Sequence, residues 1–330
     1  MKLSVHVGLH KTGTTTIQKT LELNRDTLHE AGILYPKASS IRAGGHLNLV
    51  WELTSPWKFE PSLGGLDALV DEVREAQPEH VIVSAESLSG FRRRDDVLEV
   101  PRRLAEALGA EAHIVATVRP QFLLLDSLYA QNASTGYADQ PYEEWLLTQI
   151  AEGNVDLEAL LGRWFDAYPD VSLIPVEPSS ADPLVETFLR RCGVIKAVAL
   201  EPAPRANTRT SIRAVEFGRV ASRLLQRTGT ERGRRHEVIR ELRRLIAAHF
   251  PEDPAFAGMT RETALFVHRV YAQRNETFFA RRVGGEVTFS VTPEDQRYEK
   301  RTYNLDTASV QERETFEALL LEATSNVLSK

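Results

Sequence analysis

The residues best suited to chemistry lie within the first twenty positions. Residues 3–7 alternate as in a short strand, and residues 17–23 begin a helix. Between them runs Gly8-Leu-His-Lys-Thr-Gly-Thr-Thr-Thr16. A strand, a glycine-rich turn and a helix N-terminus together form an anion cradle, because backbone N–H groups converge there on a phosphate. The alternative is a threonine-rich helix cap without a ligand, for which one hydroxyl suffices.

The spacing departs from that of nucleoside triphosphate kinases, Gly-x-x-x-x-Gly-Lys-Ser/Thr. Gly8 and Gly13 fit this pattern and Thr15 stands at the Ser/Thr position, but Thr14 takes the place of the lysine. The only lysine of the loop is Lys11. Phosphoryl transfer needs a lysine on the β- and γ-phosphates and a hydroxyl on Mg²⁺. The displaced cation therefore predicts that a different group is transferred.

The run Lys11-Thr-Gly-Thr-Thr15 resembles the 5′-phosphosulfate loop of the sulfotransferases that use 3′-phosphoadenosine 5′-phosphosulfate (PAPS). The resemblance implies that Lys11 contacts the bridging oxygen and the sulfuryl group, while the loop backbone and hydroxyls hold the 5′-phosphate. It also implies catalysis without a metal, since a singly charged sulfuryl group needs less neutralisation than a phosphoryl group. His10 lies inside the loop without an assigned chemical role. The loop residues that we expect to bind the nucleotide are His10, Lys11, Thr12, Gly13, Thr14, Thr15 and Thr16.

A second motif follows the predicted strand 112–118. Arg119 stands at the end of this strand, Pro120 suits the first helical position, and Ser127 lies eight residues after Arg119. The same sulfotransferases have an arginine and then a serine after a strand, and the resemblance implies that Arg119 and Ser127 bind the 3′-phosphate. A guanidinium fork matches a phosphate dianion well. Without the first loop, structural roles for both residues would be the simpler interpretation.

Two residues compete to be the general base that the acceptor needs. Glu86 follows the predicted strand 80–85, at the edge where open α/β sheets bind ligands. It resembles the glutamate that is the base in the glycan-modifying branch of the family. His46 has an ordinary pKa suited to proton transfer and lies in the irregular stretch 37–63, which predicts either a lid or a loop pinned to the core. We place Glu86 ahead of His46.

Composition narrows the class of protein. The chain has 330 residues, 42% of them apolar, and a net charge of −6, which argues against non-specific nucleic-acid binding as its main task. Cys192 is the only cysteine, so neither an intramolecular disulfide nor a cysteine-based metal site can form. No signal peptide or membrane-spanning apolar run is visible, and we expect a soluble cytoplasmic protein. The acceptor stays open between a small molecule and a carbohydrate.

Apolar strands alternating with amphipathic helices predict an α/β fold with a parallel sheet flanked by helices. The resemblance implies the P-loop NTPase-like sulfotransferase version of that fold. We expect a nucleotide-binding core over 1–205 and a mainly helical part over 206–330, packed on the core within the same domain. A first helix over 14–31, a helix over 182–192 capped by Asp182 and a strand over 286–291 are also expected. The remaining expected strand covers 171–176, and the other expected helices cover 66–76, 97–108, 142–150, 156–168, 211–227, 232–250, 260–282 and 310–328.

The C-terminal helices are dense in arginine. Interleaved glutamates make ion pairs on a solvated face the simpler interpretation, although these arginines could instead form a face for an acidic acceptor. The last helix could dock on the body or on a second copy of the chain, which would give a homodimer. The arginines concerned are Arg213, Arg219, Arg223, Arg240, Arg243 and Arg244.

Two other functions stay open. A P-loop kinase or nucleotide hydrolase would need Mg²⁺ and a lysine at the position of Thr14. A non-catalytic nucleotide-binding or assembly protein could keep the fold without any turnover. The glycine- and lysine-rich loop that closes the nucleotide site in the sulfotransferases has no clear match, and residues 297–301 are the nearest basic segment.

Overall fold

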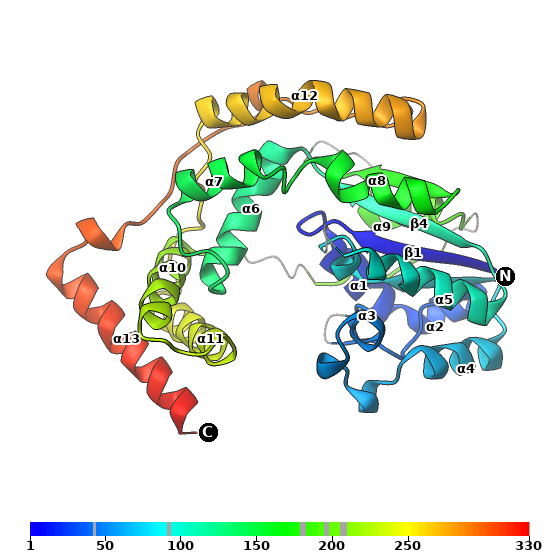
Figure 1. The fold of residues 1–330 in the computed structure, drawn as a ribbon, viewed down its shortest axis with the longest axis horizontal. Coiled ribbons are helices and arrows are strands. Elements are labelled where there is room, and N and C mark those ends of the chain that lie inside the picture. The colour runs from blue at the N-terminus through cyan, green and yellow to red at the C-terminus, as the bar shows by residue number, and fades with distance from the viewer. Residues whose placement is uncertain (42–43, 91–93, 179–182, 195–197, 205–209, 330) are drawn as a thin grey trace. The chain divides into compact units, whose positions relative to one another are not determined.

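The computed structural model describes residues 1–330 apart from 42–43, 91–93, 179–182, 195–197, 205–209 and 330. Within this described part, five strands form one sheet in the order β2-β3-β1-β4-β5, and every neighbouring pair is parallel. Figure 1 labels two neighbouring strands of this sheet, β1 and β4. The α/β class with a parallel, helix-flanked sheet is therefore confirmed. The strands are β1 (Lys2–Gly8), β2 (Ile33–Leu34), β3 (His80–Ser84), β4 (Ala112–Val118) and β5 (Val171–Pro175).

Apolar side chains on both faces of the sheet are buried under helices. Alternate residues of a strand point to opposite faces, so Val5 of β1 lies in one core and His6 next to it faces the other side, against Phe188. The core around Val5 is completed by α3 (Leu47–Thr54), α4 (Leu66–Ala76), α5 (Glu99–Leu108), α8 (Leu157–Ala167) and the end of α12 (Arg261–Val283). The opposite core is completed by α1 (Thr14–Leu23), α2 (Arg25–Glu30) and α9 (Leu184–Arg191).

The chain divides into two compact units. The first contains the sheet and consists of Met1–Pro120, Asn154–Ala206 and Val270–Val291. The second consists of Gln121–Gly153, Asn207–Arg269 and Thr292–Lys330. The boundary expected at residue 205 falls outside the described residues. The helices of the second unit are α6 (Gln121–Ser134), α7 (Tyr142–Ala151), α10 (Ile212–Arg227), α11 (Arg232–His249), α13 (Val310–Leu328) and the start of α12.

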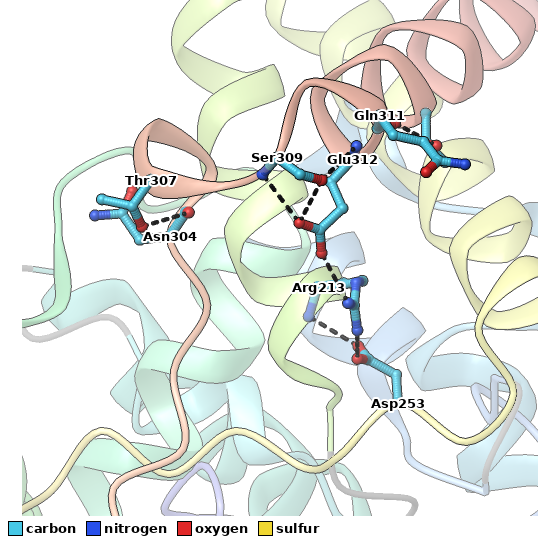
Figure 2. Close-up of polar contacts among 8 residues, drawn as sticks. Arg213, Asp253, Asn304, Thr307, Ser309, Gln311 and Glu312 are labelled. Atoms are coloured by element: carbon cyan, nitrogen blue, oxygen red, sulfur yellow. Dashed lines mark hydrogen bonds and ion pairs between the residues drawn. The ribbon is translucent and has the colours of Figure 1, made fainter.

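Helix α13 packs with α10 and α11 in the core of the second unit. Ser309 and Glu312 form the capping box that begins this helix. Glu312 also accepts from Arg213 of α10 at 3.2 Å, and Arg213 in turn donates to Asp253, as Figure 2 shows. Its own chain thus holds α13 in place, and a homodimer through this helix stays a prediction.

The expected first helix is interrupted at Asn24, where α1 gives way to α2. The Asn24 amide donates to the Thr20 carbonyl at 2.7 Å and to the Glu201 carbonyl at 2.8 Å, and its oxygen accepts from the Glu201 N–H at 2.8 Å. Asparagine side chains compete in this way with the helical hydrogen-bond ladder. A contact with a segment 177 residues away therefore sets the break.

Two further expectations about elements were wrong. Residues 286–291 form no strand, because the N–H groups of Ser290 and Val291 donate to the carboxylate of Glu177 at 3.2 and 2.9 Å. The stretch 37–63 is not wholly irregular, since it contains α3 and two short 3₁₀ turns. The expected cap by Asp182 lies outside the described residues, and α9 begins at Leu184.

Candidate functional site

The loop between β1 and α1 has the backbone geometry of an anion site. Its φ angles are positive at Gly8 (97°), Lys11 (61°) and Gly13 (86°), and such a value is uncommon for a residue with a side chain such as Lys11. The first backward hydrogen bonds of α1 run from the N–H groups of Thr16 and Ile17 to Gly13 O, at 3.0 and 3.1 Å. The N–H groups that precede them in the first turn have no intrahelical acceptor, and the helix dipole favours a negative charge there.

Close packing explains why glycine occupies two positions of this loop. A Cβ atom at Gly13 would lie 2.4 Å from Leu184 Cδ2 of α9. A Cβ atom at Gly8 would lie 2.9 Å from Ser89 Oγ and 3.2 Å from Glu86 Cα. Together with their positive φ angles, these contacts leave no room for a side chain. The loop therefore rests directly on the segment that follows β3.

Thr12 connects the loop to the end of β4 by hydrogen bonds. This residue is fully buried, its hydroxyl donates to Leu9 O at 2.5 Å, and its Oγ1 lies 2.6 Å from Thr117 Oγ1. The N–H of Leu9 also donates to Thr117 O at 2.8 Å. Because its hydroxyl holds the loop, Thr12 could reach a ligand only through its backbone N–H. Thr15 is half-buried and Thr16 is exposed.

A buried hydrogen-bond chain supports the loop from beneath. Gln18 of α1 donates to Ser84 Oγ at 3.1 Å, and Ser84 Oγ lies 2.8 Å from His6 Nδ1. His6 Nε2 lies 3.3 Å from Thr117 Oγ1. Burial lowers the pKa of His6 to about 4, although Glu86 raises it in part, so the ring is neutral at pH 7. A neutral ring accepts a hydrogen bond at one nitrogen and donates one at the other, so it can link the Ser84 and Thr117 hydroxyls.

These buried hydrogen bonds were not predicted, but the sequence carries a signal for them. His6, Ser84 and Thr117 are polar positions inside runs that are otherwise apolar. They belong to three neighbouring strands and are fully buried. Buried polar side chains need hydrogen-bond partners, so three of them in adjacent strands predict contacts with one another.

Glu86 meets two residues of the loop. It begins the 3₁₀ turn Glu86–Leu88, directly after β3, and its Oε2 accepts a hydrogen bond from the Thr14 hydroxyl. Its Oε1 lies 3.5 Å from His10 Nδ1, and the side chains of Glu86 and His10 are 35% and 38% exposed. Burial pushes the pKa of Glu86 upward, but the contacts with His10 and Thr14 outweigh it and leave that pKa below its ordinary value. Glu86 is therefore an ionised, accessible carboxylate beside the loop.

The structure brings Arg119 to the same loop. Arg119 follows β4, and its Nη1 donates to Lys11 O at 3.4 Å. A guanidinium at this point adds positive charge at the carboxyl edge of the sheet, where Glu86 also lies. Ser127 belongs to α6 in the second unit and is half-buried. Its pairing with Arg119 on one phosphate stays a prediction.

His46 serves the fold. It is fully buried, its Nε2 lies 3.0 Å from Pro36 O, and its Nδ1 accepts from the Ser84 N–H at 3.1 Å. Burial lowers the pKa of His46 to about 4. Both ring nitrogens are thus engaged by backbone groups, which weighs against His46 as a general base. The neighbouring Leu49 and Val50 of α3 are fully buried, so this part of the stretch is pinned to the core.

Neither a protein-family model nor a curated protein matches the chain. Among the helices that the structure describes, none is both long and apolar enough to cross a membrane. No group of three or more histidine, cysteine, aspartate or glutamate side chains that could hold a metal ion occurs among the described residues. The geometry of the loop is therefore the basis for a functional proposal.

Proposed function

We propose that the chain transfers a sulfuryl group from PAPS to a hydroxyl or amine acceptor without a metal. The hydrogen bond from Thr14 to Glu86 carries this proposal. In a nucleotide kinase the position of Thr14 holds a lysine that binds the β- and γ-phosphates. Here a hydroxyl bound to an ionised carboxylate takes that position. The site thus lacks the positive charge that phosphoryl transfer places at this point, and its carboxylate can remove a proton from an acceptor.

Different residues around the loop would bind different groups of the donor. The N–H groups at the start of α1 and the hydroxyls of Thr15 and Thr16 would hold the 5′-phosphosulfate. Arg119 would bind the 3′-phosphate, because its guanidinium fork matches a phosphate dianion. The close approach of Ser89 and Glu86 to Gly8, and of the Leu184 side chain to Gly13, shapes the loop for such an anion. These assignments extend the resemblance with contacts from the chain's own residues.

The reaction then needs one base and one cation. Glu86 takes the proton of the acceptor O–H or N–H group as the acceptor atom bonds to sulfur. The bond from sulfur to the bridging oxygen breaks and leaves its electron pair on the phosphate of 3′-phosphoadenosine 5′-phosphate. Lys11 compensates the charge that develops on that oxygen. His10 lies against Glu86 Oε1 and orients the carboxylate.

Calorimetric titration tests the donor site. We expect 3′-phosphoadenosine 5′-phosphate to bind in the presence of EDTA, and Arg119→Ala to weaken binding by roughly 30-fold or more, since a charge-assisted pair contributes about 2 kcal/mol. Arg102→Ala is the matched control, because Arg102 is an exposed cation of the same unit that pairs with Glu99. Equal losses in both variants would contradict the assignment of Arg119.

The same titration distinguishes the two rival functions. Binding of ATP only with Mg²⁺, and of no 3′-phosphorylated nucleotide, would replace the proposal with a kinase or hydrolase. Binding of neither nucleotide would favour a non-catalytic assembly protein. Transfer of radiolabelled sulfate from PAPS to a panel of sugars, phenols and amines then identifies the acceptor class.

A further inference from the structure

Among the six arginines that the sequence suggests as a face for an acidic acceptor, two have no polar partner in the part of the chain that the structure describes. Neither Arg240 nor Arg243 has a hydrogen bond or ion pair with any described residue. The other four of these six are engaged: Arg213 with Asp253 and Glu312, Arg219 with Glu216, Arg223 with Asp139 O, and Arg244 with Glu241. Ion pairs therefore account for three of the six and a backbone carbonyl for Arg223, and they leave Arg240 and Arg243 unexplained.

Both of these arginines line a cavity of about 250 Å³. With His236 they stand at positions i, i+4 and i+7 of α11, which places all three on one side of the helix. Ser134, Thr135 and Tyr137, from the end of α6 and the turn after it, complete the lining. The volume lies below the usual range for pockets that hold drug-sized ligands, so it suits a single ring.

Tyr137 gives the cavity an aromatic wall. Its side chain is 63% exposed, yet its backbone N–H donates to Asn132 O at 2.7 Å. The preceding Gly136 has φ 80°, and a Cβ atom there would lie 2.3 Å from Ile239 Cδ1 of α11. This glycine thus lets the turn press against the helix. The turn thus fixes the backbone of Tyr137, while its ring lies against His236 and has the guanidinium of Arg232 5.9 Å from its centroid.

His236 is oriented by the same turn. Its Nδ1 lies 3.0 Å from Thr135 O and donates to it, and its ring packs against Tyr137 with centroids 4.4 Å apart. In the neutral ring this arrangement leaves Nε2 as an acceptor. The acidic Glu241 on the same helix is bound by Arg244 and by Asn326 at 2.7 and 2.9 Å. Glu237 is exposed one position from His236, and the net charge of the lining itself remains positive.

We propose that this cavity binds a sugar ring that carries a carboxylate or a sulfate. The two guanidinium groups suit an oxyanion, the exposed part of the Tyr137 ring can pack on the C–H face of a sugar ring, and the Thr135 hydroxyl oxygen can accept from a sugar hydroxyl. The site goes beyond sulfuryl transfer, because it requires neither the nucleotide nor Glu86. A result against sulfuryl transfer would therefore not contradict this site, and a result against this site would not contradict sulfuryl transfer.

Saturation-transfer NMR on the full chain tests this site, with glucuronate and glucose 6-sulfate as probes. We expect saturable binding of both, and at least about fivefold weaker binding in Arg240→Gln and in Arg243→Gln. Arg244→Gln is the matched control, because it removes the same charge from the same helix at an ion-paired position. It should change binding by less than about twofold. An equal loss of affinity in Arg244→Gln would show that the overall positive charge of the helix attracts the probes, and it would overturn the proposal.

Two further comparisons test the sugar itself. Tyr137→Ala should weaken both probes while Tyr137→Phe, which keeps the ring, should not. Inorganic sulfate should compete poorly, and glucose without an anionic group should give no saturable signal. If inorganic sulfate displaces the probes at equal concentration, or if neither probe binds, the cavity is not a site for an anionic sugar. Circular dichroism melting of each variant confirms that it is folded.

Discussion

The Thr14 hydroxyl donates a hydrogen bond to Glu86 Oε2, although the two residues lie 72 positions apart. One begins α1 and the other follows β3, and β1 and β3 are neighbours in the sheet. The first turn of α1, where an anion is favoured, thus lies beside a carboxylate that stays ionised. An anion bound by the loop and an acceptor near Glu86 would be adjacent. This adjacency is what group transfer between them requires.

Glu86→Gln should separate catalysis from binding. Glutamine keeps an oxygen that can accept from Thr14 but cannot take a proton at neutral pH, so we expect turnover with PAPS to fall by about 10²- to 10⁴-fold. Loss of a negative charge beside the loop should leave binding of 3′-phosphoadenosine 5′-phosphate unchanged or tighten it severalfold. Steady-state kinetics and calorimetry measure the two effects. Unchanged turnover would remove Glu86 from the chemistry.

Lys11→Ala should lower the rate more than the affinity. The cation acts on charge that develops as the bond to the bridging oxygen breaks, so its loss is expected to lower kcat by about 10²-fold or more. Lys19→Ala removes the same charge from the second turn of α1, and its kcat should stay within about twofold of that of the parent chain. Rates measured at saturating PAPS test this difference. If Lys19→Ala lowers kcat as much, the loss comes from the overall electrostatic field of the protein and not from a contact of Lys11 with the reacting atoms.

The sheet could be predicted because each of its longer strands has a recognisable pattern within its own residues. Strands β1, β3, β4 and β5 are short apolar runs followed by turns or helices, and parallel strands buried on both faces have this pattern. The short β2 (Ile33–Leu34) was not among the predicted strands, because two residues carry too little pattern to show that they pair with β3. The break at Asn24 was likewise invisible, since its partner is Glu201.

The candidate site was predictable only in part. The loop and Glu86 follow from residue types at the carboxyl ends of predicted strands. The structural role of His46 could not be predicted in this way, because its contacts with Pro36 and Ser84 and its complete burial come from tertiary packing. An ordinary histidine pKa suggests a base only when the ring is accessible. Sequence gives the residue type, and the fold decides whether a proton can reach it.

Acidification should destabilise the fold through its buried histidines. Burial lowers the pKa values of His6, His46 and His80 to about 4, against 6.5 ordinarily. Between these values the unfolded chain binds protons that the folded chain does not, so this stabilisation is present above pH 6.5 and is lost as pH falls toward 4. Each histidine contributes up to about 1.4 kcal/mol per pH unit in that window.

Urea denaturation at pH 4.5 to 8 measures this dependence. His6→Asn should lower the slope of the free energy of unfolding against pH by nearly one proton, in addition to its own destabilisation. His29→Asn, at an exposed position of α2, is the control for the substitution itself. A free energy of unfolding that is flat or rises as the pH falls from 6.5 to 4.5 would contradict the prediction.

Gly13→Ala should damage both the fold and the anion site. Alanine at φ 86° is strained by roughly 1 kcal/mol, and its Cβ atom would meet Leu184 Cδ2 at 2.4 Å. Gly109→Ala is the matched control, because Gly109 has φ 59° with no atom within 4 Å of the added Cβ. We expect about 1 kcal/mol of destabilisation for Gly109→Ala and about 1–3 kcal/mol more for Gly13→Ala. Only Gly13→Ala should also weaken binding of 3′-phosphoadenosine 5′-phosphate, because only this residue shapes the loop. Equal destabilisation in thermal melts would show that Leu184 yields freely, and unchanged nucleotide affinity would show that the loop is not the binding site.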